Sequence, residues 1–387
     1  MTIAAPVVRT FLEGGLLQVE PSAIESSLAA LWQPAAEAAE QGEIPAVTRV
    51  SLGTEVVITS ADRAEEAGRV WNSVSTQHPS RAVLVEIDPA HDAGLQAAIA
   101  AACHLAAPGQ PQVCSERILL RTGPSGLDRL PGAVLPLLQA DVPATLWWDL
   151  PTPPPATVAW ALGRAMDRCL SDLTLAADPA QCYTTLRDCG CEPLSDLAWF
   201  RAARWREGLA RLFDGGTGRD VTAAIERLEV VGAGRLPGQM FPAALLAGWL
   251  AGQLGWPPTQ RAPVSQVRED DTELVSRTTW CRPTGAGEIL LSAAPVGDRR
   301  PGRLQQVTLV APTQAARWSL ERLQAQPREL LVAAHHADWC QLPTHLPAPA
   351  PERAEVLLHA LAAPPRSVVR DRALRHAAWI LGWVNAE

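Results

Sequence analysis

Apolar residues near the start of the chain recur at the spacing of a helix. Ile24, Leu28 and Trp32 fall on one helical face. Ser22 precedes them and has a side chain that can cap the first turn of such a helix. We therefore expect residues 1–45 to form a leading helical segment.

From residue 46 to residue 256, strand-like apolar runs alternate with helical patterns. Ala82–Ile87 and Val113–Arg121 are two of the strand-like runs. Leu95–Cys103 is ambiguous, because its alanines favour a helix while its larger residues alternate as in a strand. We interpret it as a strand paired with Val113–Arg121. Strands that alternate with helices predict an α/β layered domain over residues 46–256.

Within this domain, Ser195–Phe213 gives the clearest amphipathic helix. The pattern changes in the last third of the chain. Residues 257–271 are polar and contain prolines, so we expect a linker. Residues 272–387 then contain several strand-like runs before two closing helices. They predict an α+β C-terminal domain with an antiparallel sheet and terminal helices.

Charge and composition exclude several kinds of chemistry. The formal net charge is −8, which disfavours binding to nucleic acid. All basic side chains other than histidine are arginine, so Schiff-base chemistry at a lysine and a GxxxxGKS/T phosphate loop are both excluded. Residues 1–17 lack a basic segment followed by an apolar core, and no apolar run is long enough to span a bilayer. We expect a cytoplasmic protein that binds no membrane.

Catalytic and metal-binding motifs are not found in the sequence. It has no GxSxG and no GxGxxG. Gly232-Ala233-Gly234 follows a predicted strand, but without a third glycine we interpret it as a turn. The densest group of possible metal ligands is His335–Cys340, where neighbouring residues of a strand would point to opposite faces. We therefore assign no catalytic residue, no metal site and no cofactor.

Eight cysteines are present, and their spacing is not that of a zinc site. Cys189 and Cys191 are the closest pair, which makes them the local redox candidates. Cys114 and Glu116 would share one face of a strand. A thiol activated at that position is one interpretation, and a buried structural cysteine is the one we favour.

Tryptophan is unusually frequent, with fourteen residues against one tyrosine and four phenylalanines. Trp147 and Trp148 end a predicted strand, so their rings should point to opposite faces. Trp199 and Trp205 lie in the amphipathic helix with several arginines. Exposed tryptophan and arginine are typical of protein interfaces, although core packing is the alternative for each ring.

Five segments together resemble the OpcA family of glucose-6-phosphate dehydrogenase assembly proteins. They are His78–Ile87, Val113–Ile118, Val134–Trp148, Asp196–Glu207 and Leu245–Trp256. The resemblance implies a non-catalytic regulatory partner that binds glucose-6-phosphate dehydrogenase, favours its active oligomer and improves its response to glucose 6-phosphate. It also implies thioredoxin as a possible partner acting through cysteines.

These observations lead to a set of interface candidates. They are Arg81, Cys114, Glu116, Asp141, Trp147, Trp148, Trp199, Arg204, Trp205 and Arg206. Two alternatives remain open. The first is a sugar-phosphate or nucleotide-sugar enzyme with an arginine-lined cleft, which a pocket formed by Arg81, Glu116 and Asp141 would favour. The second is a purely structural scaffold.

Overall fold

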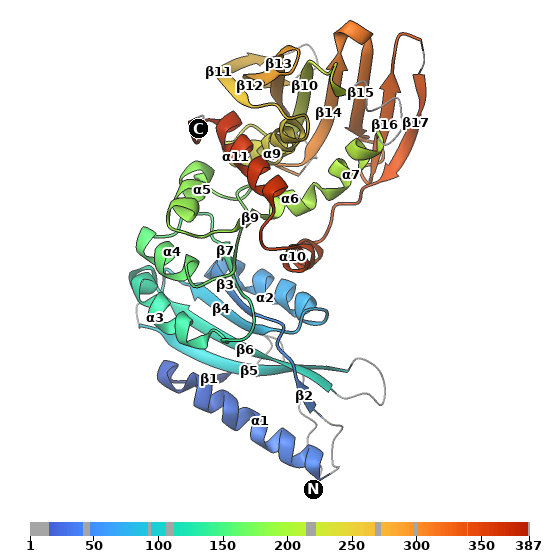
Figure 1. Cartoon of the computed structure of the whole chain (residues 1–387). Helices are drawn as coiled ribbons and strands as arrows, with labels where there is room; N and C mark the ends of the chain where they lie inside the picture. Colours follow the sequence, from blue (N-terminus) through green and yellow to red (C-terminus); the bar gives the residue numbers. More distant parts are fainter. Residues whose placement is uncertain are drawn as a thin grey trace. The chain divides into compact units, whose positions relative to one another are not determined.

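The chain folds into two compact units, each built from three segments of the sequence (Figure 1). The computed structural model describes residues 15–41, 47–91, 94–105, 112–213, 222–267, 272–296, 300–338 and 340–385. Unit 1 comprises Met1–Ser171, Thr185–Leu194 and Arg353–Pro365. Unit 2 comprises Asp172–Thr184, Ser195–Glu352 and Arg366–Glu387. The expected division of the chain near residues 257–271 is therefore replaced by several crossings between the units.

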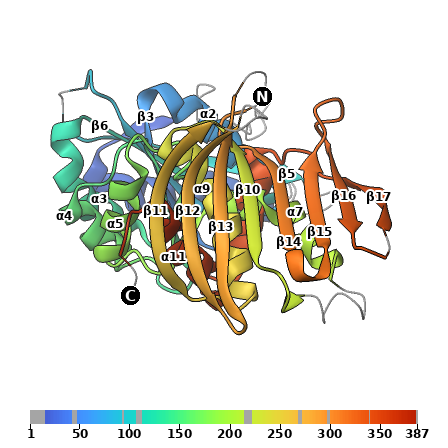
Figure 2. The same cartoon turned by 90° about the horizontal axis from the view of Figure 1, so that it is seen from above.

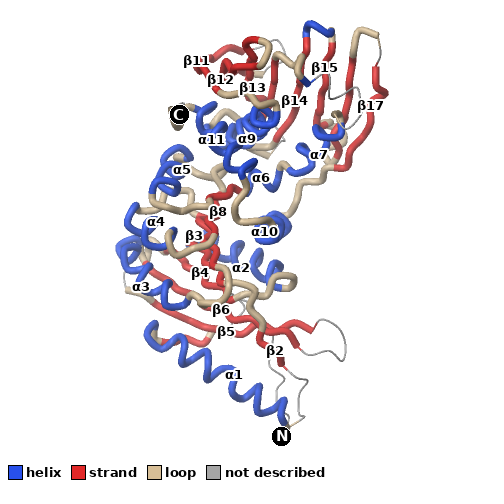
Figure 3. The backbone as a smooth tube through the Cα atoms, viewed as in Figure 1, coloured by secondary structure: helices blue, strands red, loops and turns tan. Residues whose placement is uncertain are grey.

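Unit 1 is organised around a mixed sheet that has nine strands among the described residues (Figure 3). Its order is β1-β5-β6-β4-β3-β7-β8-β9, with β2 paired to β6. The strands are β1 (Leu17–Val19), β2 (Val47–Arg49), β3 (Thr54–Ser60), β4 (Arg81–Ile87), β5 (Gln96–Leu105), β6 (Gln112–Thr122), β7 (Ala144–Asp149), β8 (Arg168–Ser171) and β9 (Leu194–Asp196), the last two residues of which belong to unit 2. Its helices are α1 (Ile24–Glu40), α2 (Ala61–Ser75), α3 (Leu130–Val134), α4 (Ala156–Gly163) and α10 (Arg353–Ala362), while α5 (Pro179–Asp188) runs from unit 2 into unit 1.

The centre of this sheet is parallel, as the alternation of strands and helices predicts. β3 runs parallel to β4 and β7, β4 runs parallel to β6, and β7 runs parallel to β8. Every residue of β4 is buried, because helices and loops cover both faces of its apolar run. β5 lies antiparallel to β6, which confirms the strand interpretation of its alanine-rich sequence.

Unit 2 contains a second mixed sheet, with eight strands in the described part of the chain. Its order is β11-β12-β13-β10-β14-β15-β16-β17. The strands are β10 (Arg227–Ala233), β11 (Pro258–Val267), β12 (Glu273–Arg282), β13 (Gly285–Ala294), β14 (Leu304–Ala311), β15 (Ala316–Arg322), β16 (Glu329–His335) and β17 (Cys340–Pro347). Its helices are α6 (Leu197–Arg201), α7 (Ala203–Arg211), α9 (Pro237–Gln253) and α11 (Val368–Leu381). In Figure 2, α9 and α11 lie behind the strands of this sheet.

The prediction of a wholly antiparallel C-terminal sheet is wrong. β10 pairs in parallel with β13, with Leu228 opposite Ile289. Between these strands the chain passes through α9, β11 and β12. A crossover of this length can return a strand to its neighbour in the same direction, which a short hairpin cannot do.

Two local predictions also differ from the structure. The range 257–271, expected to be a linker, contains β11 at Pro258–Val267, and residues 268–271 lie outside the described residues. Its prolines are accommodated because β11 is the edge strand of the sheet. The helix expected over Ser195–Phe213 is divided into α6 and α7, since Ala202 departs from helical geometry at φ −85° and ψ 8°.

Close packing of α9 against α11 depends on a small residue, Gly248. A Cβ atom there would lie 2.9 Å from the carbonyl oxygen of Ala373 and 3.0 Å from the amide nitrogen of Ala377. We expect Gly248→Ala to destabilise unit 2 in chemical unfolding. Overpacking costs about 1–3 kcal/mol, against a gain of about 1 kcal/mol in helix propensity.

Gly252→Ala is the matched control in the same helix. A Cβ atom at Gly252 would first meet Cδ of Arg372, a flexible side chain, at 3.0 Å. That variant should be as stable as the parent chain or more stable. Equal unfolding midpoints for the two variants would contradict the packing argument.

Candidate functional site

The carboxyl ends of β3 and β7 carry a buried cluster of charges. Asp149 ends β7, and its Oδ2 accepts a hydrogen bond from Thr59 at 3.1 Å. Its Oδ1 pairs with Arg63 of α2 at 2.9 Å and also with Arg353 of α10. Arg353 further pairs with Glu66 at 3.4 Å. Two helices are therefore tied to the ends of two strands through one carboxylate.

This cluster occupies a characteristic position in the fold. Strand order reverses at β3, which lies between β4 and β7. Open α/β sheets bind ligands outside the carboxyl ends of the strands at such a point. In this chain the protein's own side chains fill that position, and the guanidinium of Arg353 also lies 4.8 Å from the centre of the Trp147 ring.

The structure brings Arg81 and Glu116 together, as the alternative enzyme hypothesis requires. Nε of Arg81 donates to Glu116 at 2.6 Å, and Nη1 of Arg81 donates to the carbonyl oxygen of Leu137 at 3.0 Å. Arg81 also pairs with Glu25 of α1. Both Arg81 and Glu116 are buried, whereas Asp141 is exposed. The pair therefore holds α1 to the sheet rather than presenting charge to a ligand.

Most of the tryptophans expected at an interface are core residues. Trp147, Trp148 and Trp205 are buried. Trp199 is half-buried, and the guanidinium of Arg206 lies 3.7 Å from its ring centre. Burial lowers the pKa of Arg206 to about 10. Among the candidates of α7, Arg204 is exposed, and it pairs with Glu207 at 2.7 Å.

An exposed tryptophan lies elsewhere, on α4. The side chain of Trp160 is 56% exposed, and the guanidinium of Arg164 lies 5.3 Å from its ring centre. Val158, Ala159 and Leu162 of the same helix are buried. Helical spacing of these three apolar residues was the signal in the sequence that could have placed Trp160 on the outer face.

The burial and bonding of the cysteines differ from what the sequence led us to expect. Cys189 is half-buried and Cys191 is buried, and both are free thiols. A hydrogen bond with Cys191, together with burial, raises the pKa of Cys169 well above its usual value. Cys114 is buried and disulfide-bonded, so it is a structural residue and not an exposed interface residue. Redox control through Cys189 and Cys191 stays a prediction.

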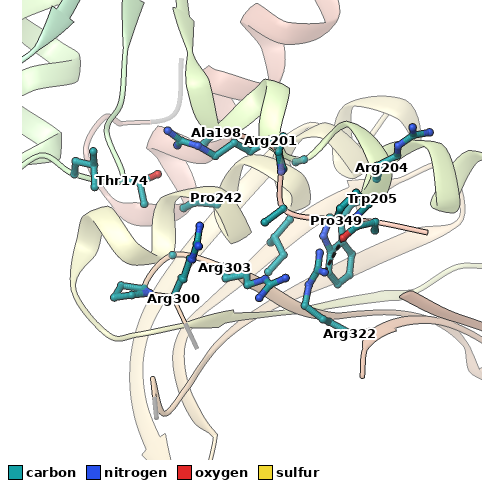
Figure 4. Close-up of a pocket in the computed structure, with 18 residues that line it drawn as sticks. Thr174, Ala198, Arg201, Arg204, Trp205, Pro242, Arg300, Arg303, Arg322 and Pro349 are labelled. Atoms are coloured by element: carbon teal, nitrogen blue, oxygen red, sulfur yellow. Dashed lines mark hydrogen bonds between the residues drawn. The ribbon is translucent and has the colours of Figure 1, made fainter. Parts of the chain in front are cut away.

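Unit 2 contains a cavity of about 220 Å³ with arginines in its wall (Figure 4). Its arginines are Arg201, Arg204, Arg300, Arg303 and Arg322. The arginine-lined cleft of the alternative enzyme hypothesis was expected around Arg81, and this cavity was not predicted from the sequence. Its residues come from the segment after β8, from α6, α7 and α9, from residues 300–304 at and before the start of β14, from the end of β15 and from the segment after β17, so no sequence spacing connects them.

Comparisons with known proteins match both halves of the chain to one family. Residues 71–188 match the glucose-6-phosphate dehydrogenase subunit N-terminal domain, and residues 192–366 match the C-terminal domain of the same subunit. An OxPP cycle protein OpcA from Synechocystis sp. is 24% identical over 60% of this chain and 48% of its own length. A second, from Nostoc punctiforme, is 26% identical over 59% of this chain and 49% of its own length. The chain thus spans about half the length of these relatives.

Solved structures with a similar backbone are oxidoreductases. KijD10, a 3-ketoreductase from Actinomadura kijaniata in complex with TDP-benzene and NADP, is 16% identical over 88% of this chain and 97% of its own, with a TM-score of 0.48. A levoglucosan dehydrogenase is 11% identical over 85% of this chain and 90% of its own, with a TM-score of 0.46. At these TM-scores the likeness carries no argument about what this chain does. No helix in the described part of the chain has the length and apolar character needed to cross a membrane.

Proposed function

Because the chain belongs to the OpcA family of glucose-6-phosphate dehydrogenase assembly proteins, we propose that it binds glucose-6-phosphate dehydrogenase as a non-catalytic partner and shifts it to its active oligomer. The family match, which includes residues of both units, carries this proposal. The role places the chain in the oxidative pentose phosphate pathway.

The charge cluster at the ends of β3 and β7 supports a non-catalytic role. Asp149 is paired with Arg63 and Arg353 at the place where an open α/β sheet would hold a ligand. A nucleotide could enter only by displacing these ion pairs. Breaking a buried ion pair costs several kcal/mol, so the cluster opposes binding there.

Activation by such a partner is a matter of linkage. A protein that binds the active oligomer more tightly than the inactive form shifts the dehydrogenase towards the active oligomer. Each factor of ten in that preference corresponds to about 1.4 kcal/mol of coupling free energy. The partner needs a docking surface for this role and no reaction of its own.

Mixing the purified chain with its cognate dehydrogenase tests this proposal. We expect the two to elute together from a sizing column, and the rate at low glucose 6-phosphate to rise. An unchanged rate curve together with separate elution would show that the proposal is wrong. Joint elution without any change in rate would favour a structural scaffold instead.

The exposed Trp160 and Arg164 of α4 are our candidate contact with the dehydrogenase. Tryptophan and arginine dominate binding energies at protein interfaces, and Trp160 is the most exposed described tryptophan with a stacked arginine. We expect Trp160→Ala to weaken binding about tenfold or more, as measured by titration. Leu342→Ala is the control, because Leu342 is 81% exposed but has no such partner on its strand. Equal affinities for the two variants would exclude α4 as the contact.

A further inference from the structure

We propose that the arginine-lined cavity of unit 2 binds the phosphate group of a small phosphate ester (Figure 4). This inference goes beyond the proposed function, because it concerns a ligand of the chain alone and needs no dehydrogenase. The cavity combines several positive charges, fixed guanidinium groups and buried polar groups without partners.

The arginines of the cavity fall into two classes. Arg201 forms a two-point ion pair with Asp172, and Arg204 pairs with Glu207. Arg300, Arg303 and Arg322 form no ion pair with any carboxylate in the described part of the chain. Three positive charges therefore lie around one cavity without a neutralising partner there.

Neutral acceptors orient two of these guanidinium groups. The carbonyl oxygen of Pro327 accepts hydrogen bonds from Nη2 of Arg303 and from Nη1 of Arg322, each at 2.6 Å. The carbonyl oxygen of Ala348 accepts a further bond from Arg322 at 3.0 Å. Such bonds fix the direction of each side chain and leave its charge intact.

Holding these like charges near one another has an energetic cost. Burial and then the neighbouring Arg300 lower the pKa of Arg303. Burial and then Arg303 lower the pKa of Arg322 to about 10. A bound anion would relieve this repulsion, and a phosphate dianion would relieve more of it than a single carboxylate.

Two polar groups at the cavity also lack partners. Oγ1 of Thr174 and Nε of Arg322 are buried without a hydrogen bond, and both residues line the cavity. A buried donor without a partner is unfavourable, and it regains a partner if an anion enters. Phosphate oxygens are suited to this, because arginine binds them through two parallel donors.

The rest of the wall is apolar, which favours an ester over the free ion. Pro242, Leu304, Pro349 and the ring of Trp205 line the cavity beside the arginines. Its volume of about 220 Å³ is several times the roughly 30 Å³ that one water occupies in the liquid. An organic group joined to the phosphate would cover this apolar surface.

Calorimetric titration of the chain alone tests the inference. The probes are inorganic phosphate, glucose 6-phosphate and phenyl phosphate at constant ionic strength, with glucose as the uncharged comparison. We expect at least one ester to bind more tightly than inorganic phosphate, and glucose not to bind. The two esters distinguish a carbohydrate body from an aromatic one.

Variants of the unpaired arginines give the second readout. We expect Arg303→Gln and Arg322→Gln each to weaken ester binding about tenfold or more, because each removes charged hydrogen bonds. Arg300→Gln should weaken it less, and since Arg300 is exposed this variant should fold even if the others do not. Arg317→Gln is the control, because Arg317 is exposed on β15, the strand that also carries Arg322.

Two results would overturn the inference. One is ester binding of equal strength in the parent chain and all three cavity variants. The other is no ester binding by the parent chain. If the variants then weaken the complex with the dehydrogenase, the cavity holds an acidic side chain of the partner instead. If the complex is unaffected, this inference fails while the proposed function stands.

Discussion

Replacing Asp149 by alanine is expected to lower the unfolding free energy of unit 1 by about 3–5 kcal/mol. Asp149 is fully buried and pairs with Arg63 and Arg353, whose side chains are 19% and 12% exposed. Removing the carboxylate leaves two largely buried guanidinium groups without their central partner. It also removes the acceptor for Thr59.

Urea unfolding followed by circular dichroism would measure this effect. Asp141→Ala is the matched control, because Asp141 is exposed on the turn that precedes the same strand. It should change the unfolding free energy by no more than about 0.5 kcal/mol. Similar losses for both variants would mean that the ion-pair cluster does not stabilise unit 1.

The second large effect is a dependence of the stability of unit 2 on pH. Asp196 caps α6, and its two carboxylate oxygens accept hydrogen bonds from the amides of Ala198 and Leu173, each at 2.8 Å. Burial, and then the nearby Asp172, raise the pKa of Asp196 to about 7 from an ordinary value of 3.8. Between these two pH values the folded state holds a proton that the unfolded state has lost.

Stability must therefore fall as the pH rises through this window. The contribution of Asp196 is most favourable below about pH 4, declines towards pH 7 and is constant above it. Asp196→Asn cannot ionise, so the difference in unfolding free energy between parent chain and variant should shrink between pH 5 and pH 8. The greater unfolding free energy of the parent chain at pH 5 should be lost at pH 8.

Asp178→Asn is the control for this experiment. Asp178 accepts a hydrogen bond from the amide of Gln181 at 2.9 Å, as a cap does, but its side chain is exposed. For Asp178→Asn, the difference in unfolding free energy from the parent chain should change much less with pH. A difference for Asp196→Asn that is constant from pH 5 to pH 8 would show that the buried carboxylate does not titrate in this range.

Local sequence patterns correctly predicted elements such as β4 and β5, whose conformation follows from residues close together in the sequence. β4 is a continuous apolar run, and such a run forms a buried central strand in most contexts. β5 was identified by its alternating larger residues even though alanine favours a helix. In both elements the periodicity of a few adjacent residues decides the structure.

The sequence was insufficient to predict which strands pair when they lie far apart along the chain. Nothing local distinguishes the parallel partner of β10 from an antiparallel one, because the choice depends on the path through α9, β11 and β12. The same is true of the tryptophans. Trp147 and Trp160 are one residue type, and only the packing around them makes the first buried and the second exposed.

The sequence by itself determined the alternation of strands and helices, the absence of lysine chemistry and the family resemblance. Tertiary structure alone decided that Asp149 meets Arg353 across more than two hundred residues of chain. It also decided that Arg303 and Arg322 line one cavity and that neither forms an ion pair with a carboxylate of the described residues. The physical reason is that charge pairing and burial depend on distances in space, which separation along the chain does not encode.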